Sequence, residues 1–248
     1  MFSKNKLKFI KSLQIKKFRK QENSFLIEGA KSVEELIDSD FKTVSLFLTE
    51  EYFNCYKAKI EQKNIPVTLC SKEELASAGS FSTNNAAIAI AEMVPNILLT
   101  PAGQEYLLLL DDIKDPGNLG TIIRIADWYG IKKIICSENT AEFYNPKVIA
   151  ATMGSFTRVK TFYGNLNEYL QKHKTFLYGA KLHGDNIHKT PFNKEGMLLI
   201  GNESNGINPE LEKFIDQSVL IPRFGKAESL NAGIATAIIC DNIFRQLS

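Results

Sequence analysis

Short apolar runs alternate with longer amphipathic stretches through the first ninety residues of the chain. Apolar runs bounded by polar residues predict strands, and apolar positions three or four residues apart predict helices. The expected strands lie at 24–29, 43–48, 66–70 and 86–92. Helices are predicted near 7–20, at 31–39, and from Glu51 and Ser71 onward. The pattern indicates a small α/β domain over residues 1–93.

Residues 94–104 interrupt this alternation, because they contain two prolines and a glycine and show no clear period. We interpret them as a linker. The alternation restarts in residues 105–248, where strands are expected at 106–110, 132–136, 158–162, 175–180, 196–200 and 218–222. Helices are predicted over about 118–129, after Pro146, near 166–173, from Asn208 and over 229–244.

The strands of this second domain are uniformly apolar, which is typical of strands buried on both faces. We therefore expect an α/β fold whose mostly parallel sheet has helices on both faces. Ligands of such folds bind in the loops at the carboxyl ends of the strands.

Composition adds little to this picture. No apolar run is long enough to span a bilayer and no signal peptide is evident, so we expect a cytoplasmic protein. The four cysteines are isolated in apolar surroundings, which predicts buried thiols in a reducing compartment. Neither they nor the three histidines have metal-ligand spacing, so we expect no metal.

Charge is distributed unevenly, although the net charge is only +2. Residues 1–20 carry eight Lys or Arg and no Asp or Glu. Such a basic arm can bind the phosphates of a nucleic acid, but a solvated helix face or a frayed terminus has the same composition.

Three polar, glycine-containing loops follow predicted strands of the second domain: DDIKDPGNLGTIIRIADWYG, GNESNGINPE and RFGKAESLN. A single loop of this kind is explained by turns, which favour glycine and asparagine without any ligand. Three that converge on one sheet edge predict a nucleotide-like ligand. The dinucleotide fingerprint GxGxxG and the phosphate loop are both absent, which disfavours pyrophosphate binding.

The segments NLGTIIRIADWYG, LLIGNESNGI and IPRFGKAESLNAGIATAI resemble the three motifs of the SpoU/TrmH family of RNA 2′-O-ribose methyltransferases, in the SPOUT superfamily. KKFRKQENSFLIEGAKSVEELI resembles the substrate-binding domain that precedes the catalytic domain in many members. The resemblance implies a C-terminal trefoil knot, S-adenosylmethionine as cofactor, a homodimer that completes the site, and an RNA-binding N-terminal domain with a ribosomal-protein-like fold.

The resemblance also implies roles for individual residues. The cofactor is expected to contact the backbone of Gly201, Ile221 and Leu230. Met153 and Gly154 are expected to border it. The polar positions of the motifs are Arg124, Asn118, Glu203, Ser229 and Asn231. We expect the Arg124 cation to stabilise the developing alkoxide near the ribose 2′-hydroxyl. Glu203 is expected to hold a guanidinium in place.

The remaining three polar positions are expected to orient ribose, phosphate or reacting groups. Residues 229–231 are also expected to cap the last helix and to face the site at once. Each residue has an alternative structural role, as a solvent-facing arginine, a loop acid or a helix cap. Gly233 departs from the family pattern, in which a small polar residue is more common.

The sequence thus favours S-adenosylmethionine-dependent methylation of a ribose 2′-hydroxyl in RNA, with ribosomal RNA preferred over transfer RNA. A second hypothesis is a non-catalytic RNA-binding or ribosome-assembly factor with the same fold. A nicotinamide-dependent oxidoreductase is disfavoured, because the dinucleotide fingerprint is missing.

Overall fold

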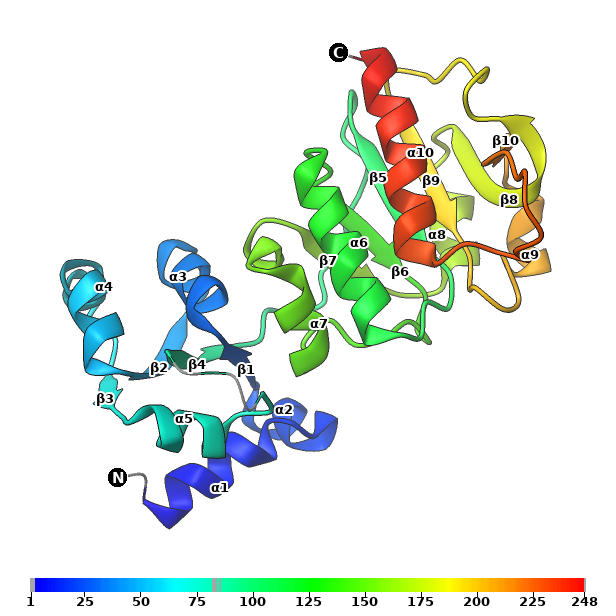
Figure 1. Cartoon of the computed structure of the whole chain (residues 1–248). Coiled ribbons are helices and arrows are strands. Elements are labelled where there is room, and N and C mark those ends of the chain that lie inside the picture. The colour runs from blue at the N-terminus through cyan, green and yellow to red at the C-terminus, as the bar shows by residue number, and fades with distance from the viewer. Residues whose placement is uncertain (1–2, 82–83, 85, 248) are drawn as a thin grey trace. The chain divides into compact units, whose positions relative to one another are not determined.

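The computed structural model describes residues 3–81, 84 and 86–247, and the chain divides into two compact units. The first comprises residues 1–95 together with 143–157, and the second comprises residues 96–142 together with 158–248. Figure 1 shows the elements of each unit. Among the described residues, no helix combines the length and the apolar character that crossing a membrane requires.

The first unit is built on a four-stranded sheet with the order β1-β4-β2-β3. β4 pairs antiparallel with both β1 and β2, and β3 joins β2 in parallel. The strands are β1 (Ser24–Glu28), β2 (Thr43–Leu48), β3 (Val67–Leu69) and β4 (Ala87–Glu92). The helices up to β4 are α1 (Lys4–Ser12), α2 (Lys16–Glu22), α3 (Ala30–Asp38), α4 (Glu50–Gln62) and α5 (Lys72–Ala78).

The predicted single helix over 7–20 is wrong, because the chain forms α1 and α2 with a turn between them. Leu13 is fully buried in this turn. The buried guanidinium of Arg19 donates from Nη1 to the carbonyl oxygens of Leu13 and Gln14, each at 2.9 Å. Arg19 therefore caps the end of α1 and is not one of the solvated bases that the composition suggested.

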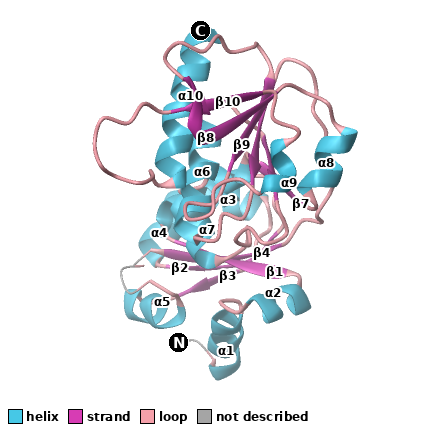
Figure 2. Cartoon of the chain, turned by 90° about the vertical axis from the view of Figure 1, so that its right-hand side faces the viewer, coloured by secondary structure: helices cyan, strands magenta, loops and turns pink. Residues whose placement is uncertain are grey.

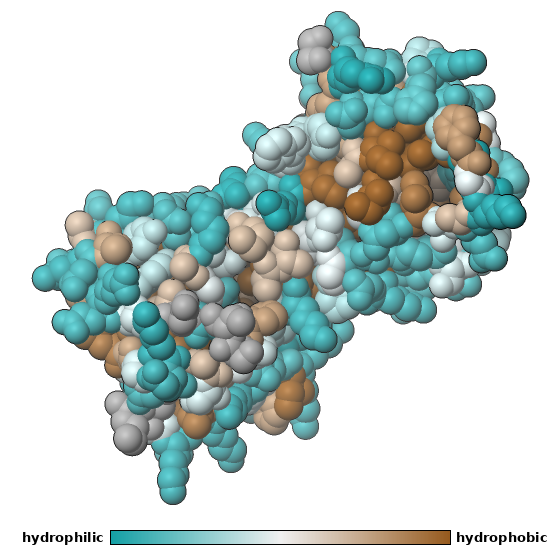
Figure 3. Space-filling model, in the orientation of Figure 1, coloured by the Kyte–Doolittle hydropathy of each residue, from teal (hydrophilic) through white to brown (hydrophobic). Residues whose placement is uncertain are grey.

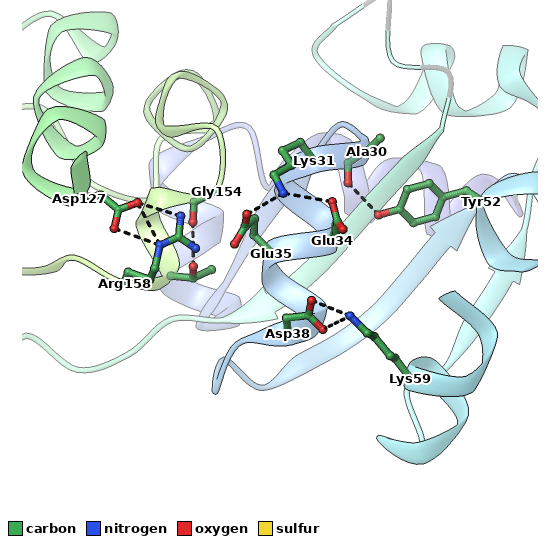
Figure 4. A network of polar contacts seen from close by, with 11 residues as sticks. Ala30, Lys31, Glu34, Glu35, Asp38, Tyr52, Lys59, Asp127, Gly154 and Arg158 are labelled. Atoms are coloured by element: carbon green, nitrogen blue, oxygen red, sulfur yellow. Dashed lines mark hydrogen bonds and ion pairs between the residues drawn. The ribbon is translucent and has the colours of Figure 1, made fainter. Parts of the chain in front are cut away.

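Polar contacts join α3 to α4 on the surface of the first unit (Figure 4). The Lys59 ammonium lies 2.8 Å from Asp38, and the Tyr52 hydroxyl donates to the carbonyl of Ala30 at 2.8 Å. Within α3, the Glu35 carboxylate beside Lys31 raises the pKa of that lysine. These ion pairs are exposed to solvent and contribute little to stability.

Residues 143–157 group with the first unit, although the sequence analysis assigns them to the second domain. They form α7 (Pro146–Thr152) and a 3-10 turn (Ser155–Thr157). Aromatic packing explains the difference, because the Phe25 ring of β1 lies 4.7 Å from the ring of Tyr144 and 6.1 Å from that of Phe156. Sequence pattern alone does not show which core such a segment joins.

The second unit is a six-stranded sheet, ordered β10-β8-β9-β5-β6-β7, in which every pairing is parallel. The strands are β5 (Tyr106–Leu110), β6 (Lys133–Cys136), β7 (Lys160–Tyr163), β8 (Leu177–Asn186), β9 (Gly196–Ile200) and β10 (Gln217–Leu220). The helices are α6 (Pro116–Trp128), α8 (Leu166–Lys172), α9 (Pro209–Glu212) and α10 (Ala232–Leu247).

Helices cover both faces of this sheet: α6 and α10 lie on one face and α8 and α9 on the other (Figure 2). All five residues of β5 and of β9 are buried. Alternate residues of β5, Leu107 and Leu109, pack in the same cluster as Tyr169 of α8 and Leu211 of α9. The period of two places their neighbours on the α6 and α10 side. The predicted α/β fold with a parallel sheet between helices is confirmed.

The cysteine prediction holds only in part. All four thiols are free; Cys136 and Cys240 are buried, whereas Cys70 is half-buried and Cys55 is exposed. Burial raises the pKa of both Cys136 and Cys240 to about 12, so neither is a thiolate at neutral pH. Prediction failed at Cys55 because its apolar neighbours lie on a helix that turns this position outward.

Candidate cofactor site

A cavity of about 620 Å³ opens where β9 and β10 end. Its lining comes from the loop after β9, the loop after β10, part of β8 and the start of α10. Among the residues singled out by sequence, those that line it are Gly201, Glu203, Ile221, Ser229 and Leu230. The volume is typical of a site for a drug-sized ligand or cofactor.

The loop after β9 is a tight turn closed by its own backbone. Asn202 and Gly206 exchange two backbone hydrogen bonds, of 3.0 and 2.8 Å. Gly201 packs so closely on this turn that a Cβ there would collide with the backbone of Gly206 and Ile207. A side chain at position 201 would therefore distort the wall of the cavity, which explains why glycine stands there.

Asp111, at the end of β5, holds the far end of the same loop. Its carboxylate accepts from the backbone N–H of Asn208 at 2.7 Å. Burial raises the pKa of Asp111, an effect that this hydrogen bond opposes and the nearby charge of Asp112 reinforces. Asn202 adds a second anchor, because its Nδ2 donates to the carbonyl of Asp112 at 2.8 Å.

The part of β8 that faces the cavity is a bulge. β10 pairs with Tyr178 and Gly179, and then, after a shift in register, with Asp185 and Asn186. The residues skipped by this shift include 180–183, which line the cavity. Bulges commonly turn side chains toward a binding site in this way. Sequence reasoning missed this contribution because it ended the strand at residue 180.

α10 begins at Ala232, three residues later than predicted. Asn231 caps it, because its Oδ1 accepts from the N–H of Ile234 at 3.2 Å and its carbonyl accepts from Ala235 at 2.9 Å. The expectation that residues 229–231 cap the helix thus holds for Asn231 and not for Ser229. The Ser229 side chain is exposed in the loop and forms no hydrogen bond with the described residues.

A chain of hydrogen bonds links all three motif loops. Asn118, in the first turn of α6, donates from Nδ2 to Oε1 of Glu203. Its Oδ1 accepts from Nδ2 of Asn231 at 2.6 Å. The Asp115 side chain caps α6 by accepting from the backbone N–H of Asn118 at 2.8 Å, which stabilises the helical turn that carries this side chain. One asparagine side chain therefore joins the loops that follow β9 and β10.

Arg124 lies elsewhere on α6. It is exposed, does not line the cavity, and its guanidinium forms no hydrogen bond or ion pair with the described residues. Within one chain, the Glu203 carboxylate accepts from the Asn118 amide and contacts no guanidinium of the described residues, so its pairing with a guanidinium stays a prediction. Arg124 is four residues before Trp128, and residues at this spacing lie on the same face of a helix.

Comparison with known proteins decides the family. The model of the SpoU rRNA Methylase family matches residues 105–241, and that of the MRM3-like substrate binding domain matches residues 4–89. The chain belongs to the SpoU rRNA methylase family. It is 31% identical over 238 residues, 94% of either chain, to the 23S rRNA (guanosine(2553)-2′-O)-methyltransferase RlmP of Bacillus subtilis.

Two further proteins match most of the chain, one in sequence and one in structure. The 23S rRNA (guanosine-2′-O-)-methyltransferase RlmB of Coxiella burnetii is 29% identical over 205 residues, which are 76% of this chain and 80% of that protein. The AdoMet-bound rRNA methyltransferase of Sinorhizobium meliloti superposes with a TM-score of 0.89 at 28% identity, covering 100% of this chain and 98% of that one.

Met153 and Gly154 are the two candidates for cofactor binding that do not line the cavity. They lie between α7 and the following turn, in the first unit, and are not among the residues that line the cavity. Both have positive φ, of 51° and 99°. A Cβ at Gly154 would collide with the side chain of Glu35 on α3, so packing within the first unit accounts for this glycine.

The Asn118 network supplies a stability prediction. Replacing Asn118 with aspartate sets a carboxylate against Glu203, and we expect the free energy of unfolding at pH 8 to fall by roughly 1–3 kcal/mol. The α6 N-terminus favours a carboxylate by only about 0.3–1 kcal/mol, so repulsion dominates. Repulsion raises the pKa of the pair in the folded state, so stability is retained at low pH and lost as pH rises through that raised pKa.

Thermal unfolding of Asn118→Asp at pH 4 and pH 8 measures this effect, with about 2–4 °C in Tm for each kcal/mol in a chain of this size. Asn167→Asp is the matched control, because Asn167 occupies the first turn of α8 and its Oδ1 accepts from Gln171 at 2.9 Å. A loss of stability at pH 8 that is equal in both variants would contradict the contact with Glu203.

Proposed function

We propose that this SpoU protein transfers a methyl group from S-adenosylmethionine to a ribose 2′-hydroxyl of RNA, and that the RNA is ribosomal. The names of its relatives support both parts, since RlmP and RlmB are 23S rRNA 2′-O-methyltransferases that match most of the chain. The observation that carries the proposal is the Asn118 side chain, which joins two loops of the cavity to the first motif helix.

The cavity fits S-adenosylmethionine in size and chemistry. Ile221 and Leu230 offer apolar side chains, and the glycine at 201 keeps the wall free of a Cβ, so the backbone at these three positions would hold the adenine and methionyl parts. The bound cofactor supplies an electrophilic methyl group on a positively charged sulfur. The AdoMet-bound relative from Sinorhizobium meliloti supports this assignment.

Side chains of the protein orient the RNA and stabilise the negative charge that forms on it. Asn118 fixes the Glu203 carboxylate and the Asn231 amide in one arrangement. With the Ser229 hydroxyl at the mouth of the cavity, these groups orient the ribose and its phosphate. In our proposal the 2′-hydroxyl releases its proton to solvent water, and the Arg124 guanidinium stabilises the alkoxide that forms.

We propose a homodimer in which Arg124 faces the cavity of the partner subunit. Trp128 on α6 is 82% exposed and Ile234 on α10 is 52% exposed. Figure 3 shows hydrophobic surface gathered over α10. Burial of Trp128 in a dimer would also bury the face of α6 that carries Arg124. The trefoil knot, the limits of the two domains and a cytoplasmic location stay predictions.

The dimer proposal predicts a change in mass. The double variant Trp128→Glu/Ile234→Glu is expected to sediment as a monomer, because two carboxylates would be desolvated at the contact. Analytical ultracentrifugation measures this, and Ile97→Glu serves as the control because Ile97 is 65% exposed outside α6 and α10. A dimer that survives the double substitution would rule out this face as the contact.

The activity itself is tested with radiolabelled S-adenosylmethionine and 23S, 16S and transfer RNA that lack modifications. A ribose 2′-O-methyl group blocks alkaline cleavage of the next phosphodiester, so we expect labelled, alkali-resistant dinucleotides from ribosomal RNA. Label in transfer RNA alone would reassign the substrate. Absence of such dinucleotides from every pool would contradict the proposed activity.

A further inference from the structure

Helices α1 and α2 carry apolar side chains that the core of the first unit does not use. Ile10 and Leu13 are fully buried in that core. Phe9 lies next to Ile10 in sequence and therefore faces another direction, and it is 36% exposed. Ile15, which precedes α2, is 54% exposed. Such exposure of apolar side chains beside a well-filled core indicates a surface with another use.

These side chains share one groove, of about 510 Å³. Phe9, Ile15 and Phe18 form its apolar part, and Lys8 and Lys11 also line it. The amides of Asn5 and Gln21 lie at the groove as well, and neither amide is hydrogen-bonded to the described residues. The groove thus combines an aromatic and aliphatic floor, cations, and groups that both donate and accept hydrogen bonds.

The charge around the groove identifies the partner as a polyanion. Seven lysines of α1 and α2 are exposed, and none forms an ion pair with a carboxylate among the described residues: Lys4, Lys6, Lys8, Lys11, Lys16, Lys17 and Lys20. Glu22, the first acid of the chain, also lines the groove, where Lys8 and Lys11 outnumber it. A second copy of this surface would carry the same charges, so self-association through it is opposed by repulsion.

We propose that this groove binds an unpaired nucleotide of the RNA, with the base on Phe9 and Ile15 and the flanking phosphates on Lys8 and Lys11. The inference rests on the proposed function for the identity of the polyanion. Single strands expose the faces of their bases, and stacking on aromatic side chains is the usual way proteins hold them. Bases of a duplex are stacked on one another and cannot enter such a groove.

The test uses two probes without cofactor: a 12-nucleotide oligo(U) and a 12-base-pair RNA duplex. The variant Phe9→Ala/Ile15→Ala is expected to bind oligo(U) roughly tenfold more weakly, since stacking contributes about 1–3 kcal/mol per base. Duplex affinity and the salt dependence for oligo(U) should not change, because no charge is removed. Lys8→Gln/Lys11→Gln should instead reduce the salt slope for oligo(U) by about 1.4, or about 0.7 for each phosphate that is no longer neutralised.

Leu69→Ala is the matched control, because Leu69 is 50% exposed on β3 of the same unit and lies outside the groove. Ultraviolet cross-linking of oligo(U) followed by mass spectrometry should attach nucleotide to the peptide that contains Phe9. Thermal unfolding checks that each variant is folded. These assays measure binding without turnover, so their result does not depend on whether the chain methylates RNA.

Several results would overturn the inference. Phe9→Ala/Ile15→Ala could leave both affinities unchanged, or could weaken oligo(U) and duplex equally. Cross-links confined to other peptides would also show that no base enters the groove. A last contrary result concerns poly-glutamate. If it fully displaces oligo(U) from the parent chain, and if Phe9→Ala/Ile15→Ala weakens its binding as much as that of oligo(U), the groove would be assigned to an acidic peptide.

Discussion

Replacing Arg124 with alanine is expected to lower kcat for methyl transfer by roughly two to three orders of magnitude, the usual effect of removing one group that stabilises developing negative charge. Arg124 is exposed and forms no contact through its guanidinium with the described residues, so the fold should be unaffected. Single-turnover methylation with saturating RNA and cofactor measures the chemical step, and filter binding measures RNA affinity, which should remain largely intact.

Arg245→Ala is the control for Arg124, because it removes a guanidinium from the last turn of α10, where it donates to Asn242 at 3.0 Å. Full activity of the Arg124 variant would refute the proposed role. If Arg124 acts on the partner's cavity, mixing this variant with a subunit defective in the cofactor cavity should restore about a quarter of the activity. Half of the pairs are then mixed, and each mixed pair has one intact site.

Gly201→Ala is expected to weaken cofactor binding and to destabilise the second unit by roughly 1–3 kcal/mol. The added methyl group would collide with the backbone of Gly206 and Ile207, which cannot rotate away as a flexible side chain could. The turn after β9 must shift, and with it the wall of the cavity. Calorimetric titration with S-adenosylmethionine should show at least a tenfold loss of affinity, equivalent to about 1.4 kcal/mol.

Gly225→Ala is the matched control in the loop after β10, because a Cβ there has no atom within 4 Å. We expect this variant to bind the cofactor nearly as well as the parent chain. Retention of normal affinity in Gly201→Ala, with an unchanged melting temperature, would contradict the close packing on which the shape of the cavity depends.

Strand positions were largely predictable, because a run such as Tyr106–Leu110 is buried on both faces and leaves a continuous apolar signal. The predicted helix and strand limits failed where contacts between distant parts of the chain determine the local structure. The N-terminal basic helix breaks in two because Arg19 hydrogen-bonds the carbonyls of the turn, an arrangement that helical periodicity does not encode. β8 continues through a polar stretch to Asn186 because it pairs with β10 after a bulge.

The site was predictable in its motifs and not in its pairings. The resemblance to the family's motifs led to Asn118, Glu203 and Asn231, and the structure joins these three side chains. The motifs did not indicate that the Glu203 carboxylate accepts from an amide, because the partner of a carboxylate depends on which loop folds over it. Positive φ and packing against Glu35 account for Gly154 without a ligand, so the expectation that Met153 and Gly154 border the cofactor stays a prediction.

Hydrogen exchange with and without S-adenosylmethionine tests the central claim most directly, because the claim concerns which loops hold the cofactor. We predict that saturating cofactor slows amide exchange in residues 201–207 and 221–231 and leaves α3 and α4 unchanged. Cofactor binding without protection of these two loops, or no binding at all, would contradict the assignment of this cavity as the methyl-donor site.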